Sequence, residues 1–156
     1  MATGAFGLLI YSRDATAPWW SNSLTPPIKA ALGLRLKVGG GTDAHRVMSY
    51  NPFVSLQWMV DGKTAAGMPT RDAEELAARE EALRLYTQGS AWFTHDDTRR
   101  GTLEPGKLAD LAVLTADYMT VPEDAIANIE SLLTMVGGRI VYATGPYAEL
   151  EQPSTP

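Results

Sequence analysis

The sequence lacks cysteine and has only two histidines, His45 and His95, among its 156 residues. Without cysteine there is no disulfide, thiolate zinc site or thiol nucleophile. Two histidines also exclude, within one copy of the chain, any metal site built from three or four imidazoles. The chain is too short for a complete (β/α)8 barrel, which takes about 250 residues. Its length allows one core with a small second lobe.

Blocks of basic residues and long apolar runs are missing as well. There are 18 acidic against 13 basic residues, for a formal net charge of −5. Because no Lys/Arg block could neutralise phosphates, we expect neither nucleic acid nor an anionic membrane as a partner. No segment is long enough to span a bilayer, and the apolar residues 5–11 lack the basic region of a signal peptide. These features predict a cytoplasmic protein.

A helix followed by a strand is predicted early in the chain. Thr25 fits the N-cap position, Pro26 the first turn and Gly33 the C-terminal cap. Residues 34–38 (LRLKV) alternate as in a strand, and the glycines at 39–41 end it. Helix, short link, strand and glycine turn are typical of the second half of a βαβ unit, which implies a parallel sheet.

Two longer helices are predicted next. Asn51-Pro52 and the apolar spacing that follows predict a helix up to residue 60, which Asp61-Gly62-Lys63 ends. A second, amphipathic helix is predicted from Asp72 to Tyr86, with Asp72 and Glu75 as a capping box. Its predicted apolar stripe consists of Leu76, the stem of Arg79, Ala82, Leu83 and Tyr86.

Short strands replace helices after residues 96–100, where we place a boundary. Glu104-Pro105-Gly106-Lys107 is typical of a type II turn. Residues 108–114 predict a covered strand. Residues 132–142 predict a hairpin whose two-residue turn is Gly137-Gly138.

Asp43 is the strongest candidate for a functional residue. It follows the carboxyl end of the predicted parallel strand, the edge where ligands bind in (β/α)8 and doubly wound sheets. A carboxylate there can bind a metal or take a proton from water, although it can also simply cap the following segment. His45, two residues on, could face the same side of an extended loop and bind substrate. A solvent-exposed or backbone-bonded histidine is the alternative.

Other clusters favour structural interpretations. His95-Asp96-Asp97 lies beside Arg99-Arg100, so a solvated turn is favoured over a metal cluster. Trp19-Trp20 and Trp58 could line a pocket, but a place in the core is favoured. No serine stands in a GxSxG elbow, so nothing supports a serine hydrolase.

Four segments resemble, in order, the carboxyl-terminal part of the metal-dependent amidohydrolase superfamily. The resemblance is to the amidohydrolase 3 group, which includes N-substituted formamide deformylase-like enzymes. The segments are residues 41–44 (GTDA), 80–87 (EEALRLYT), 101–114 (GTLEPGKLADLAVL) and 134–142 (TMVGGRIVY). Together they lie within about residues 23–145 and form a specific signal.

The resemblance implies an α/β plus β fold: the last segment of a (β/α)8 amidohydrolase barrel, followed by part of a composite β-sandwich. Residues 23–95 would be the barrel segment and 96–150 the small sandwich portion, after an irregular leader, 1–22, and before a disordered tail, 151–156. It also implies hydrolysis of C–N bonds in a small amide or formamide. A divalent metal, expected to be zinc, would serve the intact enzyme.

The resemblance also implies roles for single residues. Asp43 matches the carboxylate after the last barrel strand, a catalytic proton shuttle and metal ligand. Lys107 and Asp110 match the family's GKxAD stretch, whose role is structural. The family's His-x-His pair, its metal-bridging Lys or Glu and its two later histidines are absent, and Ala78 stands where a capping Ser or Thr is usual.

Three functions follow as hypotheses. In the first, the chain is the carboxyl-terminal part of a C–N hydrolase, inactive alone and without a tightly bound metal. In the second, it is an interaction module that completes the barrel of a separately encoded amino-terminal half, or self-associates, because an opened barrel leaves an unpaired strand edge. In the third, the chain is an unrelated small α/β enzyme in which Asp43 and His45 act together as the general base, although no nucleophile is evident.

Overall fold

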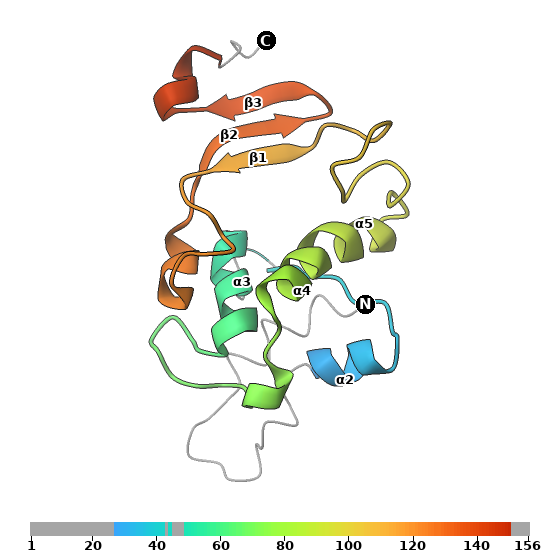
Figure 1. The fold of residues 1–156 in the computed structure, drawn as a ribbon, viewed down its shortest axis with the longest axis vertical. Coiled ribbons are helices and arrows are strands. Elements are labelled where there is room, and N and C mark those ends of the chain that lie inside the picture. The colour runs from blue at the N-terminus through green and yellow to red at the C-terminus, as the bar shows by residue number, and fades with distance from the viewer. Residues whose placement is uncertain (1–26, 43, 45–48, 151–156) are drawn as a thin grey trace.

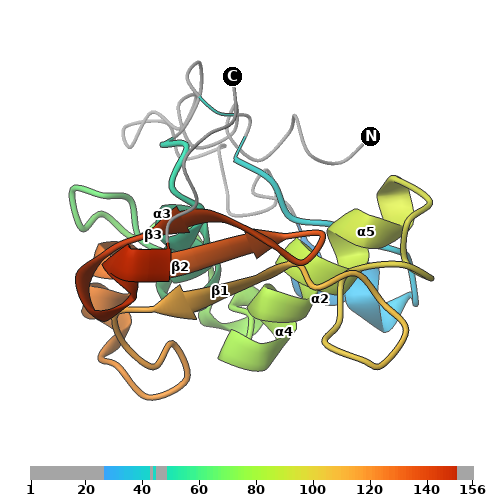
Figure 2. The ribbon, with the colours of Figure 1, turned by 90° about the horizontal axis from the view of Figure 1, so that it is seen from above.

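The computed structural model describes residues 27–42, 44 and 49–150, and these form a helical layer with a small sheet at one end (Figure 1). The helices are α2 (Ile28–Gly33), α3 (Pro52–Asp61), α4 (Arg79–Arg84) and α5 (Ser90–Phe93), and the strands are β1 (Leu111–Leu114), β2 (Ser131–Val136) and β3 (Arg139–Ala143). In Figure 2, seen from the end that carries the sheet, the strands lie in front of α3 and α4.

The predicted first helix is confirmed as α2, but its cap is not the predicted one. The N-cap position is Pro27, which offers no side-chain acceptor, and Thr25 and Pro26 lie outside the described residues. The Glu75 carboxylate instead accepts the backbone N–H of Lys29 at 2.9 Å. A residue 46 positions away therefore satisfies one of the free N–H groups at the start of this helix.

The strand predicted at residues 34–38 is wrong. The segment forms no ladder, Leu34 is 74% and Leu36 57% exposed, and Arg35 has a left-handed φ of 56°. A strand needs a neighbour to satisfy its backbone, and none of the described segments lies beside this one as a strand. The parallel sheet that this strand implied is likewise not formed, since the sheet of the described residues is antiparallel.

Helix α3 forms as predicted. The side chain of Asn51 accepts the backbone N–H of Phe53 at 2.9 Å, and Pro52 occupies the first turn. Gly62 ends the helix with a left-handed φ of 68°, a conformation that glycine adopts without steric cost.

The helix predicted from Asp72 to Tyr86 begins later and ends later than expected. Asp72 precedes only a short 3-10 turn, Ala73–Glu75, and makes no capping bond there. The chain then runs extended to Ala78, whose N–H bonds the Glu81 carboxylate at 3.2 Å. The capping box fails because Glu75 is occupied by α2. From Arg79 the chain stays helical through α4, a π-helical turn (Leu85–Gly89) and α5.

The sheet has the order β1-β2-β3, with both pairs antiparallel. The predicted hairpin is confirmed, and Gly137 and Gly138 both have positive φ, 58° and 82°, as a type I′ turn requires. The predicted type II turn is also confirmed: Lys107 N–H bonds the Glu104 carbonyl at 3.1 Å, and Gly106 has φ 90°. The covered strand predicted at 108–114 is shortened to β1, and its residues are not fully buried.

The main core joins the helices to the segment that precedes β2. A 3-10 turn, Glu123–Asn128, packs on α3, and Ile126 and Ile129 are fully buried. They share one cluster with Leu56, Met59 and Ala82. None of the helices in the described ranges has the length and apolar character needed to cross a membrane.

Candidate functional site

The two predicted site residues, Asp43 and His45, lie outside the described residues. The structure does describe residues 36–42, which precede Asp43, and these residues pack against the helical stretch over 79–93. Residues 36–42 run without regular secondary structure beside the helical stretch that contains α4 and α5 (Figure 1). Gly39 and Gly40 are buried there.

Glycines allow this segment and the helix to approach closely. A Cβ added to Gly39 would lie 2.8 Å from the Phe93 ring, and one added to Gly40 would overlap the Tyr86 ring. On the helix side, a Cβ on Gly89 would collide with the carbonyl oxygen of Val38. Such contacts leave no room for a side chain, so these positions require glycine for space rather than for backbone conformation.

Hydrogen bonds fix the same segment in register. Gly40 N–H donates to the Leu85 carbonyl at 2.9 Å, and the Ser90 hydroxyl donates to the Gly40 carbonyl at 2.8 Å. The Leu85 carbonyl also accepts the N–H of Ser90, five residues on, which is the π-helical pattern. The π turn therefore sits at the point where the helix contacts the segment before Asp43. Such turns occur frequently at functional sites.

Tyr86 connects this contact to α3. Burial raises the pKa of Tyr86 above its ordinary value, and the nearby Ser55 of α3 opposes that rise. Ser55 is itself buried. The Tyr86 ring packs against Gly40, and this contact joins the segment 36–42 to the helical stretch.

Within the described part of the chain, the residues present do not fit a metal ion. No three histidine or carboxylate side chains gather there in a way that could hold one. His95 is exposed, and Asp96 pairs with Arg99 at 3.3 Å and with Arg100 at 3.5 Å. The solvated turn predicted for His95-Asp96-Asp97 is confirmed.

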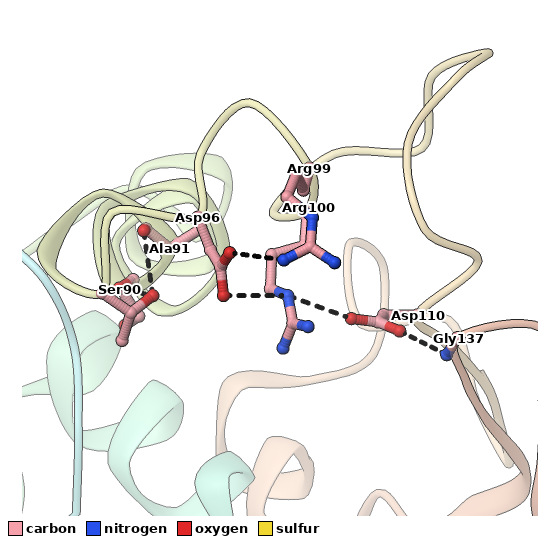
Figure 3. Close-up of polar contacts among 8 residues, drawn as sticks. Ser90, Ala91, Asp96, Arg99, Arg100, Asp110 and Gly137 are labelled. Carbon is pink, nitrogen blue, oxygen red and sulfur yellow. Dashed lines mark hydrogen bonds and ion pairs between the residues drawn. The ribbon is translucent and has the colours of Figure 1, made fainter.

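The structural role expected for Lys107 and Asp110 matches the observed contacts, of which those of Asp110 are drawn in Figure 3. Asp110 accepts the N–H of Gly137 at 2.6 Å, which fixes the hairpin turn, and lies 3.6 Å from Arg100. The Lys107 ammonium donates to the Asp97 carbonyl at 2.9 Å. Asp110 thus holds the loop 96–110 to the hairpin, and Lys107 closes that loop on itself.

Trp58 is a core residue, as expected. It is 3% exposed, its indole N–H donates to the Thr70 hydroxyl at 2.8 Å, and the buried Arg71 guanidinium stacks 4.8 Å from its ring centroid. Burial lowers the pKa of Arg71, and Glu75 opposes this. Trp19 and Trp20 lie outside the described residues.

Sequence reasoning missed the residues that hold the segment before Asp43: Tyr86, Gly89 and Ser90. Tyr86 was predicted on an apolar stripe, but its contact with Gly40 was not. The glycine at position 89, inside what proves to be a continuous helical stretch, is the signal that could have found it. A glycine in a helix interior costs stability, so it marks a close approach by other backbone.

The chain belongs to the amidohydrolase family. The model of that family matches residues 6–142, which include the glycine segment, the helical stretch beside it, strands β1 and β2 and all but the last residue of β3. The resemblance of the four sequence segments to this family is thereby confirmed. No solved structure matches the chain significantly.

Two curated relatives are similar over 116 residues. N-substituted formamide deformylase of Arthrobacter pascens is 30% identical, with 74% of this chain and 21% of the relative covered. Amidohydrolase YtcJ of Bacillus subtilis (strain 168) is 28% identical, with 73% of this chain and 22% of the relative covered. The matched region thus spans about a fifth of the length of each relative.

Proposed function

We propose that this chain is the carboxyl-terminal part of a hydrolase that cleaves non-peptide C–N bonds in a small amide or formamide. The family match over residues 6–142 carries the proposal. The deformylase among its relatives supports formamides as the substrate class. The intact enzyme would work in the cytoplasm.

In this proposal residues 23–95 are the last segment of a (β/α)8 barrel, and residues 96–150 are part of a composite β-sandwich. The clamp of Gly39 and Gly40 on Tyr86 and Ser90 supports this arrangement. These contacts fix the position of the backbone shortly before Asp43.

Asp43 is the proposed catalytic group. Its carboxylate takes a proton from the water as the C–O bond forms at the carbonyl carbon, and then gives that proton to the leaving nitrogen as the C–N bond breaks. His45 is proposed to contact the substrate. A divalent metal, zinc by expectation, belongs to the intact enzyme, and we assign no step of this chain to it.

We propose further that the chain alone is inactive. Zinc takes four ligands, and Asp43 with His45 supplies too few. Metal analysis and a hydrolysis assay with an N-substituted formamide test this on the purified chain. We expect less than stoichiometric zinc and no turnover, whereas one zinc per chain together with turnover would contradict it.

A chimera provides the active counterpart. In it, the matching region of the Arthrobacter pascens deformylase is replaced by residues 23–145 of this chain. We expect the chimera to bind zinc and hydrolyse the formamide. A folded chimera with bound zinc and no hydrolysis would contradict the proposed function.

One observation favours a second candidate function. Leu34 and Leu36 are largely exposed on a segment that pairs with no described strand, as in a surface that docks on a partner. The chain would then complete the barrel of a separately encoded amino-terminal half, or self-associate. Light scattering after size exclusion measures this for the chain alone, and a stable monomer would argue against self-association.

A further inference from the structure

The side chain of Ser90 reaches the segment that precedes Asp43. Its hydroxyl donates to the carbonyl oxygen of Gly40 at 2.8 Å and lies 3.2 Å from the carbonyl oxygen of Leu85. A hydroxyl has one proton to donate, so the nearer oxygen, that of Gly40, accepts the stronger bond. Ser90 and Gly40 are 50 positions apart, and the bond therefore joins two separate parts of the fold.

The backbone of Gly40 is bonded on both sides of its Cα. Its N–H donates to the Leu85 carbonyl at 2.9 Å, and its carbonyl accepts the Ser90 hydroxyl. Both peptide groups that meet at this buried glycine are fixed, although glycine has no side chain that could hold them. The chain reaches Asp43 three residues later.

Ser90 supplies two donors at the π-helical turn. Its backbone N–H bonds the Leu85 carbonyl, which closes the turn, and its hydroxyl bonds the Gly40 carbonyl. The Leu85 carbonyl also accepts the Gly40 N–H, so the turn and the segment share one acceptor. The irregular turn and the contact with the segment therefore meet in one residue, as is common for π turns at functional sites.

The turn that carries Ser90 is tightly packed. A Cβ added to Gly89 would lie 2.2 Å from the Val38 carbonyl oxygen, and one added to Gly101 would lie 2.9 Å from the Cβ of Ala91. Two other stretches of the chain thus contact the turn closely. A side chain on so rigid a support holds its bonding partner more precisely than one on a free loop.

We propose that Ser90 is a positioning residue for the hydrolysis proposed above. Its hydroxyl fixes the Gly40 carbonyl and thereby the course of the backbone from which Asp43 follows. A displacement of about 1 Å can slow a reaction about 100-fold, so a fixed backbone at this point favours the alignment of the carboxylate with water and substrate. The inference rests on the proposed function and adds to it a residue that acts through the backbone of Gly40.

Ser90→Ala in the chimera with the deformylase tests this role. The variant should lower kcat for the N-substituted formamide about tenfold, while KM and the zinc content stay within about twofold. Thr94→Ala is the matched control, because its hydroxyl belongs to the same helical stretch and bonds only carbonyls there, that of Ala91 at 3.0 Å. Its kcat should stay within about twofold. Equal kcat in the two variants would overturn the proposal, as would a loss confined to KM.

Amide hydrogen exchange in the full chain gives a measurement that needs no turnover. In Ser90→Ala the Gly40 N–H should exchange about fivefold faster than in the unmodified chain, whereas Thr94→Ala should leave it unchanged. Urea unfolding shows that both variants are folded. Unchanged exchange at Gly40 in Ser90→Ala would overturn the proposal. An unmodified chimera that binds zinc without turnover would instead contradict the proposed function, so the two failures are told apart.

Discussion

Arg79 and Tyr118 hold each other through hydrogen bonds that run in opposite directions. The Arg79 guanidinium donates to the carbonyl of Tyr118, and the Tyr118 hydroxyl donates to the carbonyl of Arg79 at 3.0 Å. The same guanidinium also donates to the Val121 carbonyl. Arg79 begins α4, and Tyr118 lies between β1 and β2, so the pair joins the helical layer to the strand region.

Removal of this arginine should therefore destabilise the chain more than loss of an exposed ion pair. Arg79→Gln leaves two carbonyls without their charged donor and should lower the free energy of unfolding by about 2 kcal/mol. The matched control Arg84→Gln breaks an exposed pair with Glu80 on the same helix and should cost less than about 0.5 kcal/mol. Urea unfolding measures both. Equal losses would show that the Arg79 contacts add nothing to stability.

Tyr118 should make stability depend on alkaline pH. Burial raises the pKa of Tyr118 to about 12, from 10.0, and the charge of Arg79 opposes this rise. Between these values the unfolded chain has released the phenolic proton while the folded chain retains it, so stability falls as pH rises. From about pH 9 to about pH 11, the unmodified chain should lose about 1 kcal/mol more than Tyr118→Phe. Parallel urea curves at both pH values measure this difference, and identical losses would contradict it.

The close contact between Gly40 and the Tyr86 ring should tolerate no side chain at position 40. Gly40→Ala places a methyl group in the Tyr86 ring and should cost about 1 to 3 kcal/mol in the free energy of unfolding. Gly33→Ala is the control, because nothing lies within 4 Å of its added methyl, and it should be neutral or slightly stabilising. Urea unfolding compares the two. If Gly40→Ala matches the control, the close packing before Asp43 is wrong.

Asp110 should stabilise the hairpin turn through Gly137. Asp110→Ala removes the acceptor of the Gly137 N–H and the partner of Arg100, at an expected cost of about 1 to 2 kcal/mol. Asp97→Ala removes an exposed carboxylate and should change stability by less than about 0.5 kcal/mol. Heteronuclear NMR adds a local measurement, since the Gly137 amide signal should shift only in the Asp110 variant. An unshifted signal would contradict the bond.

The features that sequence predicted well are those decided by neighbouring residues. Asn51 caps α3 by accepting the N–H of Phe53, only two residues further on. Gly137 and Gly138 supply both left-handed positions of their own turn. The turn at Pro105-Gly106 has the same local origin. In each case the chemistry that sets the structure lies within a few positions, so a pattern of letters is sufficient.

The features that failed depend on distant partners. Glu75 fits a local capping box by spacing, but it caps α2 instead, since Lys29 offers it a free N–H. The alternation at 34–38 is typical of a strand, yet a strand forms only beside another strand. Of the candidate site, Asp43 was predicted from its position after the expected strand and from the resemblance, whereas the contacts of Tyr86 and Ser90 with Gly40 required the packed structure.

The activity of Asp43→Asn in the chimera with the deformylase tests the central claim most directly. If Asp43 is the proton-transferring carboxylate, kcat/KM for the N-substituted formamide should fall by about 100-fold or more, because an amide cannot accept the proton. Asp97→Asn, in the same chimera, should leave kcat/KM unchanged. Equal activity of Asp43→Asn and the unmodified chimera would contradict the account.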